Sequence, residues 1–190
     1  MPETGLRLNL GCGHRRREGF LNVDKFGEPD QKVDLEQFPW PWPDSSVQEI
    51  VLQHVLEHLG QATDVYLKII QEIYRVCRNG ATIYIEVPHP RHDNFLGDPT
   101  HVRPITPQSL DLFSKKHNQA SIAAGAASTT LAIYLNVDIE ITSAIAVLEP
   151  AYLREMQAGR LSQQQVEHLA RTNNNVIIDF QIHCVVRKPS

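Results

Sequence analysis

The sequence predicts an α/β fold, in which a mainly parallel β-sheet carries helices on both of its faces. Two observations support this prediction. Short apolar runs alternate along the chain with segments whose apolar residues repeat at helical spacing. The chain also has the length of one large domain, 190 residues, and 42% of them are hydrophobic, which is enough to bury a core. We therefore expect a single domain.

Four short strands are predicted in the first half of the chain. They cover residues 7–10, 20–23, 31–35 and 49–52. The first of them is a buried apolar run that ends in the glycine turn Gly11-Cys12-Gly13. Three prolines within residues 39–43 exclude a regular element between the third strand and the fourth.

One helix and one strand are predicted in the middle of the chain. The helix begins at Asp64, with Thr63 as its expected N-cap, and Asn79-Gly80 is its stop signal. Its apolar stripe at helical spacing consists of Val65, Ile69, Ile73 and Val76. Residues 81–87 follow as the clearest strand in the sequence.

The second half of the chain begins with a long loop. Residues 88–107 carry five prolines and three histidines, so we expect a loop of fixed shape with a function. Thr106 is the expected cap of a helix that reaches about Lys116, and the stretch to Thr130 is ambiguous. Beyond it we expect a strand at 133–147, a helix at 151–171 in which Ser162 is an alternative second start, and a last strand at 176–186.

Composition excludes several functional classes. The chain has 18 Lys+Arg against 22 Asp+Glu, a net charge of −4, which argues against the broad basic surface of a nucleic-acid-binding protein. Cys12, Cys77 and Cys184 are widely spaced, so they predict neither a disulfide framework nor a cysteine zinc site. The N-terminus lacks the features of a signal peptide, and polar residues interrupt the uncharged stretch 117–137. We expect a soluble, cytoplasmic protein that binds no membrane.

The glycine turn indicates a nucleotide-type site. Glycines at the end of a strand let the backbone approach a ligand, and a helix that follows them offers free N–H groups. Here the third glycine of the dinucleotide pattern is missing, and His14 to Arg17 stand in its place. Asp24 closes the second strand, where it can accept hydrogen bonds from ribose hydroxyls, although a turn cap explains it equally well.

A set of motifs in a fixed order points to a family. The motifs are Leu8-Asn-Leu-Gly-Cys-Gly13, Gly19-Phe-Leu-Asn-Val-Asp24, Val33-Asp-Leu35, Pro41-Trp-Pro-Asp-Ser-Ser46, His54-Val-Leu-Glu-His-Leu59 and Tyr74-Arg-Val-Cys-Arg-Asn-Gly80. Over residues 6–116 the chain resembles a class I S-adenosylmethionine-dependent methyltransferase of the small bacterial type 11-like group. The resemblance implies a Rossmann-like three-layer sandwich with a seven-stranded, mainly parallel sheet and an antiparallel last strand.

The resemblance also implies a division of the single domain. Residues 1–116 would form the cofactor-binding core, and residues 176–190 would form the closing strand. Residues 117–175 match no part of the family. They are longer than the core fold needs and poor in charge up to Asp138, so we expect them to cover the substrate pocket or to form a homodimer contact.

Eight residues are implied to bind S-adenosyl-L-methionine. They are Gly11, Cys12, Gly13, Asp24, Asp34, Leu35, Gln53 and His54. In the family pattern the glycine turn contacts the methionine part of the cofactor through its backbone, and Asp24 holds the ribose diol. Asp34 accepts a hydrogen bond from the adenine amino group, and the Leu35 amide contacts a ring nitrogen. Gln53 meets the amino end of the cofactor through its carbonyl, with His54 close by. The arginines 15–17 either meet the methionine carboxylate or form a solvated face, which we favour.

His54, Glu57 and His58 form an HxxEH motif, whose offsets place three side chains on one face of a helix. This is the ligand spacing of the inverted zinc-peptidase motif, but a peptidase needs a long helix, and here Gly60 follows at once. Some methyltransferases bind a divalent metal through a similar face. We expect no metal; the candidate ligands of a metal-dependent enzyme are His54, Glu57, His58 and His101.

Methyl transfer is an in-line displacement, in which the protein aligns the nucleophile and excludes water. A hydroxyl nucleophile also needs a base, and neutral histidine suits that role near pH 7. His101 is the first candidate, because relatives carry a similar Thr-His-Val, and His58 is the second. His89 and His92 are expected to be loop-surface or substrate contacts.

The sequence therefore predicts methyl transfer from S-adenosyl-L-methionine to a small-molecule or sugar-like acceptor, with oxygen favoured over nitrogen. Two alternatives come from other classes. One is a non-catalytic, regulatory domain that binds the cofactor, and the other is the HxxEH zinc metallopeptidase. A turnover assay with candidate acceptors distinguishes a methyltransferase from the regulatory domain, and stoichiometric zinc bound to the protein would indicate the metallopeptidase.

Overall fold

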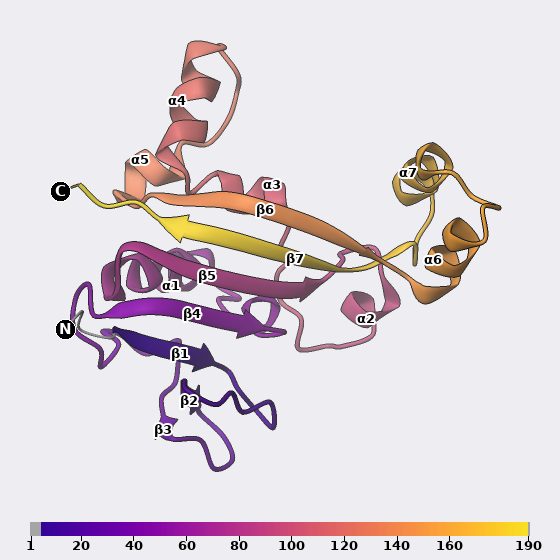
Figure 1. The fold of residues 1–190 in the computed structure, drawn as a ribbon. Coiled ribbons are helices and arrows are strands. Elements are labelled where there is room, and N and C mark those ends of the chain that lie inside the picture. The colour runs from indigo at the N-terminus through magenta and orange to yellow at the C-terminus, as the bar shows by residue number, and fades with distance from the viewer. Residues whose placement is uncertain (1–4, 190) are drawn as a thin grey trace.

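The computed structural model describes residues 5–189. Its seven-stranded sheet has the strand order β3-β2-β1-β4-β5-β7-β6 (Figure 1). The strands are β1 (Leu6–Leu10), β2 (Leu21–Asp24), β3 (Gln31–Lys32), β4 (Val47–Gln53), β5 (Cys77–Pro88), β6 (Ile139–Leu148) and β7 (Ile177–Val186). The neighbouring strands β3, β2, β1, β4 and β5 are parallel to one another. Strand β7 lies between β5 and β6 and is antiparallel to both. The expected mainly parallel sheet with an antiparallel last strand is confirmed.

All helices of the described residues come after β4 in the chain. They are the 3-10 turn η1 (Leu56–His58), α1 (Thr63–Val76), α2 (Asp93–Leu96), α3 (Pro107–Asp111), α4 (Lys115–Ala123), α5 (Leu131–Leu135), α6 (Pro150–Gln157) and α7 (Gln163–Thr172). Helices α4 and α5 project from one end of the sheet, and α6 and α7 extend from the other end, at the tip of the β6–β7 hairpin (Figure 1). None of the helices in residues 5–189 has the length and apolar character to span a bilayer.

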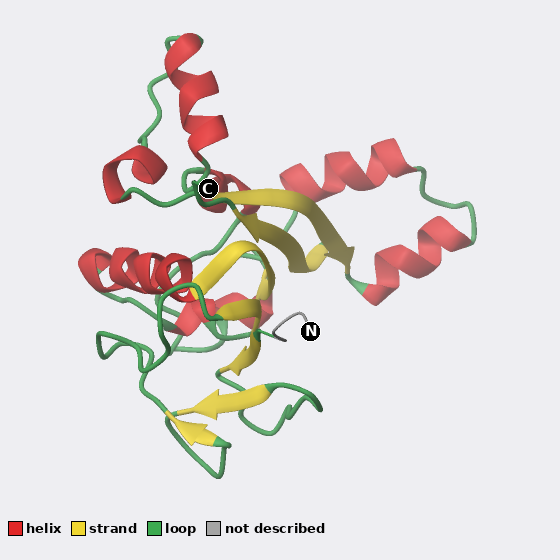
Figure 2. Cartoon of the chain, turned by 60° about the vertical axis from the view of Figure 1, so that its left-hand side comes forward, coloured by secondary structure: helices red, strands yellow, loops and turns green. Residues whose placement is uncertain are grey.

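The hydrophobic core lies on one face of the sheet, where α1 packs (Figure 2). Ile50 and Leu52 of β4 are fully buried in it, and Ile83 of β5 is 2% exposed. Ile69 and Ile73 of α1 meet these strands from the helical side, as the predicted stripe requires. The side chains of alternate strand residues therefore share one buried face.

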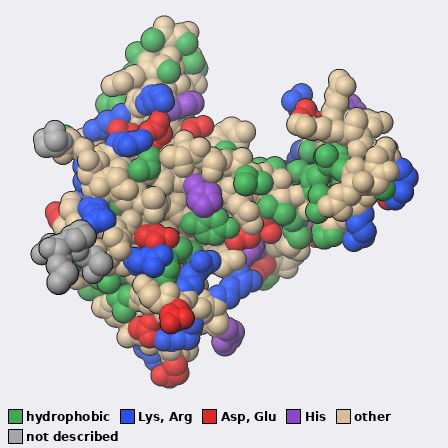
Figure 3. Space-filling model, in the orientation of Figure 1, with side chains coloured by type: hydrophobic (Ala, Val, Ile, Leu, Met, Phe, Trp, Pro, Cys, Tyr) green, Lys and Arg blue, Asp and Glu red, His purple; other side chains and the backbone are tan. Residues whose placement is uncertain are grey.

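The opposite face of β4 and β5 is open. Along β5 the exposed or half-buried Thr82, Tyr84 and Glu86 alternate with the buried core residues, and with Gln53 and His183 they line a groove of about 380 Å³. Figure 3 looks onto this face, where hydrophobic, charged and histidine side chains lie next to one another. In residues 5–189 the second helical layer of the expected three-layer sandwich is therefore absent over this part of the sheet.

The short connections between the first strands explain the missing layer. Residues 11–20 join β1 to the parallel β2, and residues 25–30 join β2 to β3, both without a helix. A crossover between parallel strands that contains a helix needs about a dozen residues or more. The first connection has too few residues for a full crossover helix, and the second is shorter still.

Several element boundaries differ from the sequence prediction. The strand expected at 133–147 begins only at Ile139, because residues 131–135 form α5, which ends at Asn136 in a left-handed conformation. The helix expected from Thr106 stops at Asp111, and Ser114 caps α4 separately by accepting a hydrogen bond from the His117 amide. These breaks follow local side-chain capping, which a broad apolar pattern does not reveal.

The ends of two other helices test the capping predictions. Ala62 rather than Thr63 is the N-cap of α1, so the predicted cap is wrong by one position. Ser162 does start a second helical segment, because it forms a capping box with Gln165 at the beginning of α7. The last strand, predicted at 176–186, agrees with β7 to within one residue.

Candidate active site

A cavity of about 210 Å³ opens where the carboxyl ends of β1, β2 and β4 meet. Its lining consists of Gly11, Asp24, Lys25, Phe26, Val33, Asp34, Leu35, His54, Val55, His58 and Leu59. Five of the eight predicted cofactor residues are among them, from four separate segments of the chain. In parallel α/β sheets this edge is where ligands bind.

The glycine turn brings the backbone against the cavity wall. Gly11 has a positive φ of 62°, and a Cβ placed on it would lie 2.5 Å from a methyl group of Val55. Only glycine allows this approach. Cys12 points away from solvent and is 4% exposed, and burial raises the pKa of its thiol, so its side chain is not a nucleophile for the cavity.

Asp24 both closes a turn and faces the cavity. Its Oδ1 accepts a hydrogen bond of 2.9 Å from the Phe26 amide, and its Oδ2 accepts one of the same length from the Gly13 amide. A carboxylate offers about four acceptor positions, so each oxygen keeps one for a ligand. The turn-cap explanation is therefore correct, and ribose binding stays a prediction.

Asp34 and Leu35 place an acceptor beside a donor. Asp34 Oδ1 accepts a 3.0 Å hydrogen bond from the Glu36 amide, while its Oδ2 lies 4.0 Å from Lys25 Nζ. The side chain of Leu35 is buried, and its amide has no acceptor among residues 5–189. A carboxylate oxygen and an unused amide at one cavity wall match the donor and acceptor edge of a purine.

Sequence reasoning missed part of the same wall. Lys25 and Phe26 line the cavity directly after Asp24, and 70% of the Phe26 surface is exposed. Their position directly after the acid that closes β2 is the signal that could have identified them, because ligands of parallel α/β sheets bind outside the carboxyl ends of the strands.

Gln53 does not line the cavity, although it is the last residue of β4. Its side chain lies on the open face of the sheet, where its amide nitrogen donates a 2.8 Å hydrogen bond to Glu86. Its amide oxygen accepts a 3.2 Å hydrogen bond from Arg17. Any contact with the methionine end through the Gln53 carbonyl stays a prediction.

His54 links the cavity to a second cluster of polar residues. It has a positive φ of 55°, and its Nδ1 lies 3.5 Å from a carboxylate oxygen of Glu57, an ion-pair distance without good hydrogen-bond geometry. That carboxylate raises the pKa of His54. Glu86 and Asp179 also come within 4.8 Å of His54, and burial raises the pKa of Asp179.

The HxxEH motif does not form the expected helical face. His54 is left-handed and η1 has only three residues, so the long helix of a zinc peptidase is not formed. Glu57, His58 and His101 nevertheless come together, each offering a ligand atom within 4.8 Å of the others. Glu57 is 1% exposed, and neither of its carboxylate oxygens has a hydrogen-bond partner among the described residues.

Two hydrogen bonds fix the rings of His58 and His101. His101 Nδ1 lies 2.9 Å from the carbonyl oxygen of Phe95, so this nitrogen carries the proton. Thr100 donates its hydroxyl to Asp98, so at 2.9 Å it can only accept from His58 Nδ1. In the neutral form of each ring, Nε2 therefore holds the lone pair. The two rings lie edge to face, 4.6 Å apart, and only His58 lines the cavity.

His89 and His92 have structural contacts in the same loop. His89 Nδ1 accepts a hydrogen bond from the Arg91 amide, and its ring packs on Phe180. His92 caps α2 by accepting from the Asn94 amide, and its Nε2 lies 3.4 Å from Glu149. These contacts agree with a supporting role rather than a catalytic one.

Comparison with known proteins identifies the fold. No family model matches the chain, and no curated protein matches it. Among solved structures, a SAM-dependent methyltransferase from Archaeoglobus fulgidus is 21% identical, with a TM-score of 0.56 over 95% of this chain and 86% of that one. The chain has the Rossmann-like fold of the S-adenosylmethionine-dependent methyltransferases. A SAM-dependent methyltransferase from Methanosarcina mazei, 15% identical, matches 100% of this chain and 95% of its own length with a TM-score of 0.53.

The methyltransferase fold accounts for the position of the cavity. Its strand order reverses between β1 and β4, and the cavity lies outside the carboxyl ends of these two strands. His58 enters the cavity from η1, directly beyond β4.

Proposed function

We propose that the chain is an S-adenosylmethionine-dependent methyltransferase that acts on a small-molecule or sugar-like acceptor, with oxygen favoured over nitrogen. One observation carries the proposal: Gly11, Asp24 and the Asp34–Leu35 pair line a single cavity of about 210 Å³. The donor set suits the cofactor, because Asp24 retains acceptor positions for a diol and the Leu35 amide is an unused donor.

The chain's own residues would bind and orient the cofactor. Gly11 and Gly13 allow close backbone approach, Asp24 would hold the ribose hydroxyls, and Asp34 with Leu35 would hold the adenine edge. When bound, the cofactor supplies a methyl group on a sulfonium centre. His58 lines the same cavity and would help to exclude water from it.

Replacing Asp24 by Ala tests cofactor binding. The change removes hydrogen bonds from ribose hydroxyls to a charged acceptor, each worth about 1.5–3 kcal/mol, so the affinity should fall about tenfold or more. Isothermal titration calorimetry with S-adenosyl-L-methionine measures the loss. Asp64→Ala is the matched control, because Asp64 is an exposed acid in the first turn of α1. Equal affinities of wild type and Asp24→Ala, or no binding by wild type, would refute the assignment.

For a hydroxyl acceptor we propose His101 as the base, with His58 beside it. The Nε2 of His101 holds a lone pair because its Nδ1 faces the Phe95 carbonyl, and Asp98 lies 3.8 Å from that Nε2. His101 would hold there the proton that the acceptor hydroxyl loses. Asp98 would stabilise the resulting imidazolium.

Replacing His101 by Ala should lower turnover by roughly 10²–10⁴ while the cofactor affinity barely changes, because His101 does not line the cavity. Steady-state assays with a panel of hydroxyl and amine acceptors measure turnover, and calorimetry measures affinity. His168→Ala, at an exposed position of α7, is the control. Wild-type turnover by His101→Ala would exclude the base and favour nitrogen methylation, since a neutral amine can attack without one.

A divalent metal is a second candidate at the same place, and buried Glu57 favours it. A carboxylate that is 1% exposed and has no hydrogen-bond partner is costly unless something binds it. Glu57, His58 and His101 would hold the metal, with His54 next to them, and it would supply Lewis acidity to an acceptor oxygen. Both His Nδ1–H groups are already held by neighbours, as in metal sites.

Titration of Mn²⁺ into the protein separates the two candidates. A metal site predicts stoichiometric binding by wild type, little binding by Glu57→Gln, silencing of turnover by a chelator, and partial rescue of His101→Ala by added Mg²⁺ or Mn²⁺. A base without metal predicts no stoichiometric binding and no effect of the chelator.

A further inference from the structure

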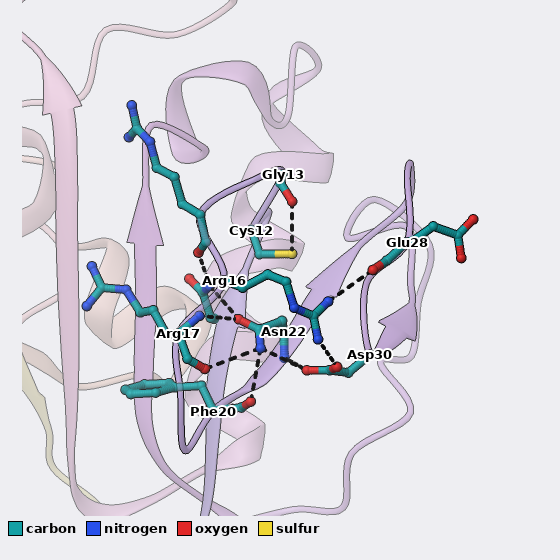
Figure 4. A network of polar contacts seen from close by, with 10 residues as sticks. Cys12, Gly13, Arg16, Arg17, Phe20, Asn22, Glu28 and Asp30 are labelled. Carbon is teal, nitrogen blue, oxygen red and sulfur yellow. Dashed lines mark hydrogen bonds and ion pairs between the residues drawn. The ribbon is translucent and has the colours of Figure 1, made fainter.

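The two edges of the sheet differ in how they are protected from pairing with another chain. One edge is β3, which has only two residues and carries the exposed Lys32. The chain beside it is fixed by polar contacts, because Asp30 accepts a hydrogen bond from the side chain of Asn22 in β2 and pairs with Arg16 (Figure 4). A short edge strand with a charged side chain discourages pairing. This edge is therefore protected.

The other edge is β6, and it has none of these features. It is ten residues long, and residues 141–148 include no charged residue and no proline. The consecutive residues 142–146 are all exposed, so the middle of the strand is uncovered on both faces of the sheet. In the described part of the chain, no loop or side chain forms a hydrogen bond with the backbone of residues 140–148 from outside the sheet. A long, uncharged edge of this kind is a template for another strand.

Large apolar side chains gather around the same edge. In Figure 1 helices α4 and α7 rise beyond β6, one near each of its ends, and Figure 3 shows that the surface between these two projections is hollowed. Five of the seven large hydrophobic side chains that are exposed in residues 5–189 belong to α4, α5, β6 and α6: Ile122, Ile133, Tyr134, Ile145 and Leu153. Apolar groups that gather in this way mark an interaction surface.

The two ends of β6 carry charges of opposite sign. At its beginning, the carboxylate of Glu140 has two cations at 3.1 Å, Lys116 and Arg187, so this group has one positive charge in excess. The side chain of Lys116 is 83% exposed. Beyond its end, Glu149 lies 3.4 Å from His92, and no lysine or arginine of residues 5–189 comes within 4.0 Å of it. An antiparallel copy of the strand would therefore place each basic end beside an acidic end.

We propose that β6 is the interface of a homodimer, in which the β6 strands of two copies pair antiparallel about a two-fold axis. Such a contact is isologous, so the surface must complement itself. The uncharged residues 141–148 meet the same segment of the second copy, and Lys116 faces Glu149 of the partner subunit. Helices α4 and α5 of each copy then lie beside α6 and α7 of the other, where their apolar side chains are buried. This interface goes beyond the proposed function and does not depend on it.

Analytical ultracentrifugation of the full chain tests the proposal. Wild type should sediment as a dimer at micromolar concentrations. Ile145→Lys should be monomeric, because it places a charge from each copy in the middle of the paired edge. Leu96→Lys is the matched control, because Leu96 is 63% exposed in α2, away from β6, and this variant should stay dimeric. An unchanged far-UV circular dichroism spectrum shows that both variants fold.

Charge reversal tests the antiparallel arrangement. Lys116→Glu and Glu149→Lys should each weaken association several-fold, because each places like charges together across the interface. The double variant should recover most of the loss, since it restores opposite charges at both ends. A double variant that associates no better than the single variants would exclude this arrangement.

Three results of the sedimentation experiment would overturn the homodimer itself. A wild-type chain that stays monomeric would show that β6 does not pair with its own copy. A dimer that survives Ile145→Lys would place the contact elsewhere on the molecule. Equal loss of the dimer in Leu96→Lys would show that an added lysine, and not its position on the edge, causes dissociation.

Discussion

At the scale of single residues, Asp24 combines two roles that the sequence could not separate. Its carboxylate accepts the amides of both Gly13 and Phe26, so it fixes the glycine turn to the end of β2. Asp24 also lines the cavity. A residue that caps a turn therefore also shapes the binding surface, and the choice between cap and ligand that the spacing left open is not exclusive.

His89 gives a prediction about pH. Burial lowers its pKa, and the charges of Arg91 and His92 lower it further. The folded state therefore disfavours the protonated ring. As the pH falls through the unfolded-state pKa, the unfolded chain binds a proton that the folded chain does not, so stability is lost toward acid.

The comparison of wild type with His89→Gln isolates this contribution from the other histidines. Urea unfolding at pH 7.5 and pH 5.5 should show that acid lowers the free energy of unfolding more for wild type than for His89→Gln. A variant with the same pH dependence as wild type would show that His89 titrates alike in both states.

At the scale of elements, β5 shows what the sequence could predict and what it could not. The order of strands and the buried stripe of α1 follow from hydrophobic periodicity, which local sequence carries. The single buried face of β5 was also readable, because Thr82, Tyr84 and Glu86 alternate with Ile83 and Ile85. A strand covered on both faces would be apolar throughout, so this alternation predicts that one face of β5 stays open.

The candidate site was predictable only where a motif fixes the backbone. Asp24 ends β2, Gly11 directly follows β1, and Asp34 lies just beyond β3, so the topology brings the three together. The contact between His58 and His101 depends instead on a proline-rich loop, whose Val102 amide donates a hydrogen bond to the Glu57 carbonyl. No periodic pattern specifies such a path. The side-chain direction of Gln53 depends on pleat register, which a shift of one residue reverses.

Helix α3 holds the end of that loop, and its cap can be tested. Thr106 Oγ1 accepts a 3.1 Å hydrogen bond from the Ser109 amide, and Ser109 Oγ accepts one of 3.0 Å from the Thr106 amide. Thr106→Ala should lower the free energy of unfolding by about 1 kcal/mol, measured by urea denaturation. Thr130→Ala is the control, because Thr130 precedes α5 without a side-chain cap. Equal effects of the two changes would show that the capping box contributes nothing specific.

At the scale of the whole molecule, residues 117–175 contribute to the sheet itself, and a cover over the substrate pocket stays a prediction. They include β6, which completes the edge of the sheet beside β7. Helices α4 and α5 project into solvent, where Tyr134 is 80% exposed and Ile133 is 47% exposed. A homodimer contact at these helices stays a prediction. Helix α7 ends instead beside residues 88–107, where Arg91 donates to the carbonyl of Arg171 and Asn175, which follows the helix, donates to Asp93.

Arg91 connects the loop of residues 88–107 to the arm formed by α6 and α7, residues 150–172. Removal of its side chain should loosen that arm. The guanidinium of Arg91 donates to the carbonyls of Ala170 and Arg171 in the last turn of α7, where a cation is favoured by the helix dipole. Arg91→Ala leaves these carbonyls without a protein partner. Limited proteolysis should then cut residues 158–162, between α6 and α7, several-fold faster than in wild type.

The same experiment separates the arm from the cofactor site. Arg154→Ala, an exposed change on α6, should leave the cleavage rate unchanged. Affinity for S-adenosyl-L-methionine should stay the same in Arg91→Ala, because the loop contact lies outside the cavity lining. Unchanged cleavage would show that Arg91 does not hold the arm. A loss of cofactor affinity would show that the arm and the cavity are coupled through residues 88–107, so that these residues transmit a displacement at α7 to His101.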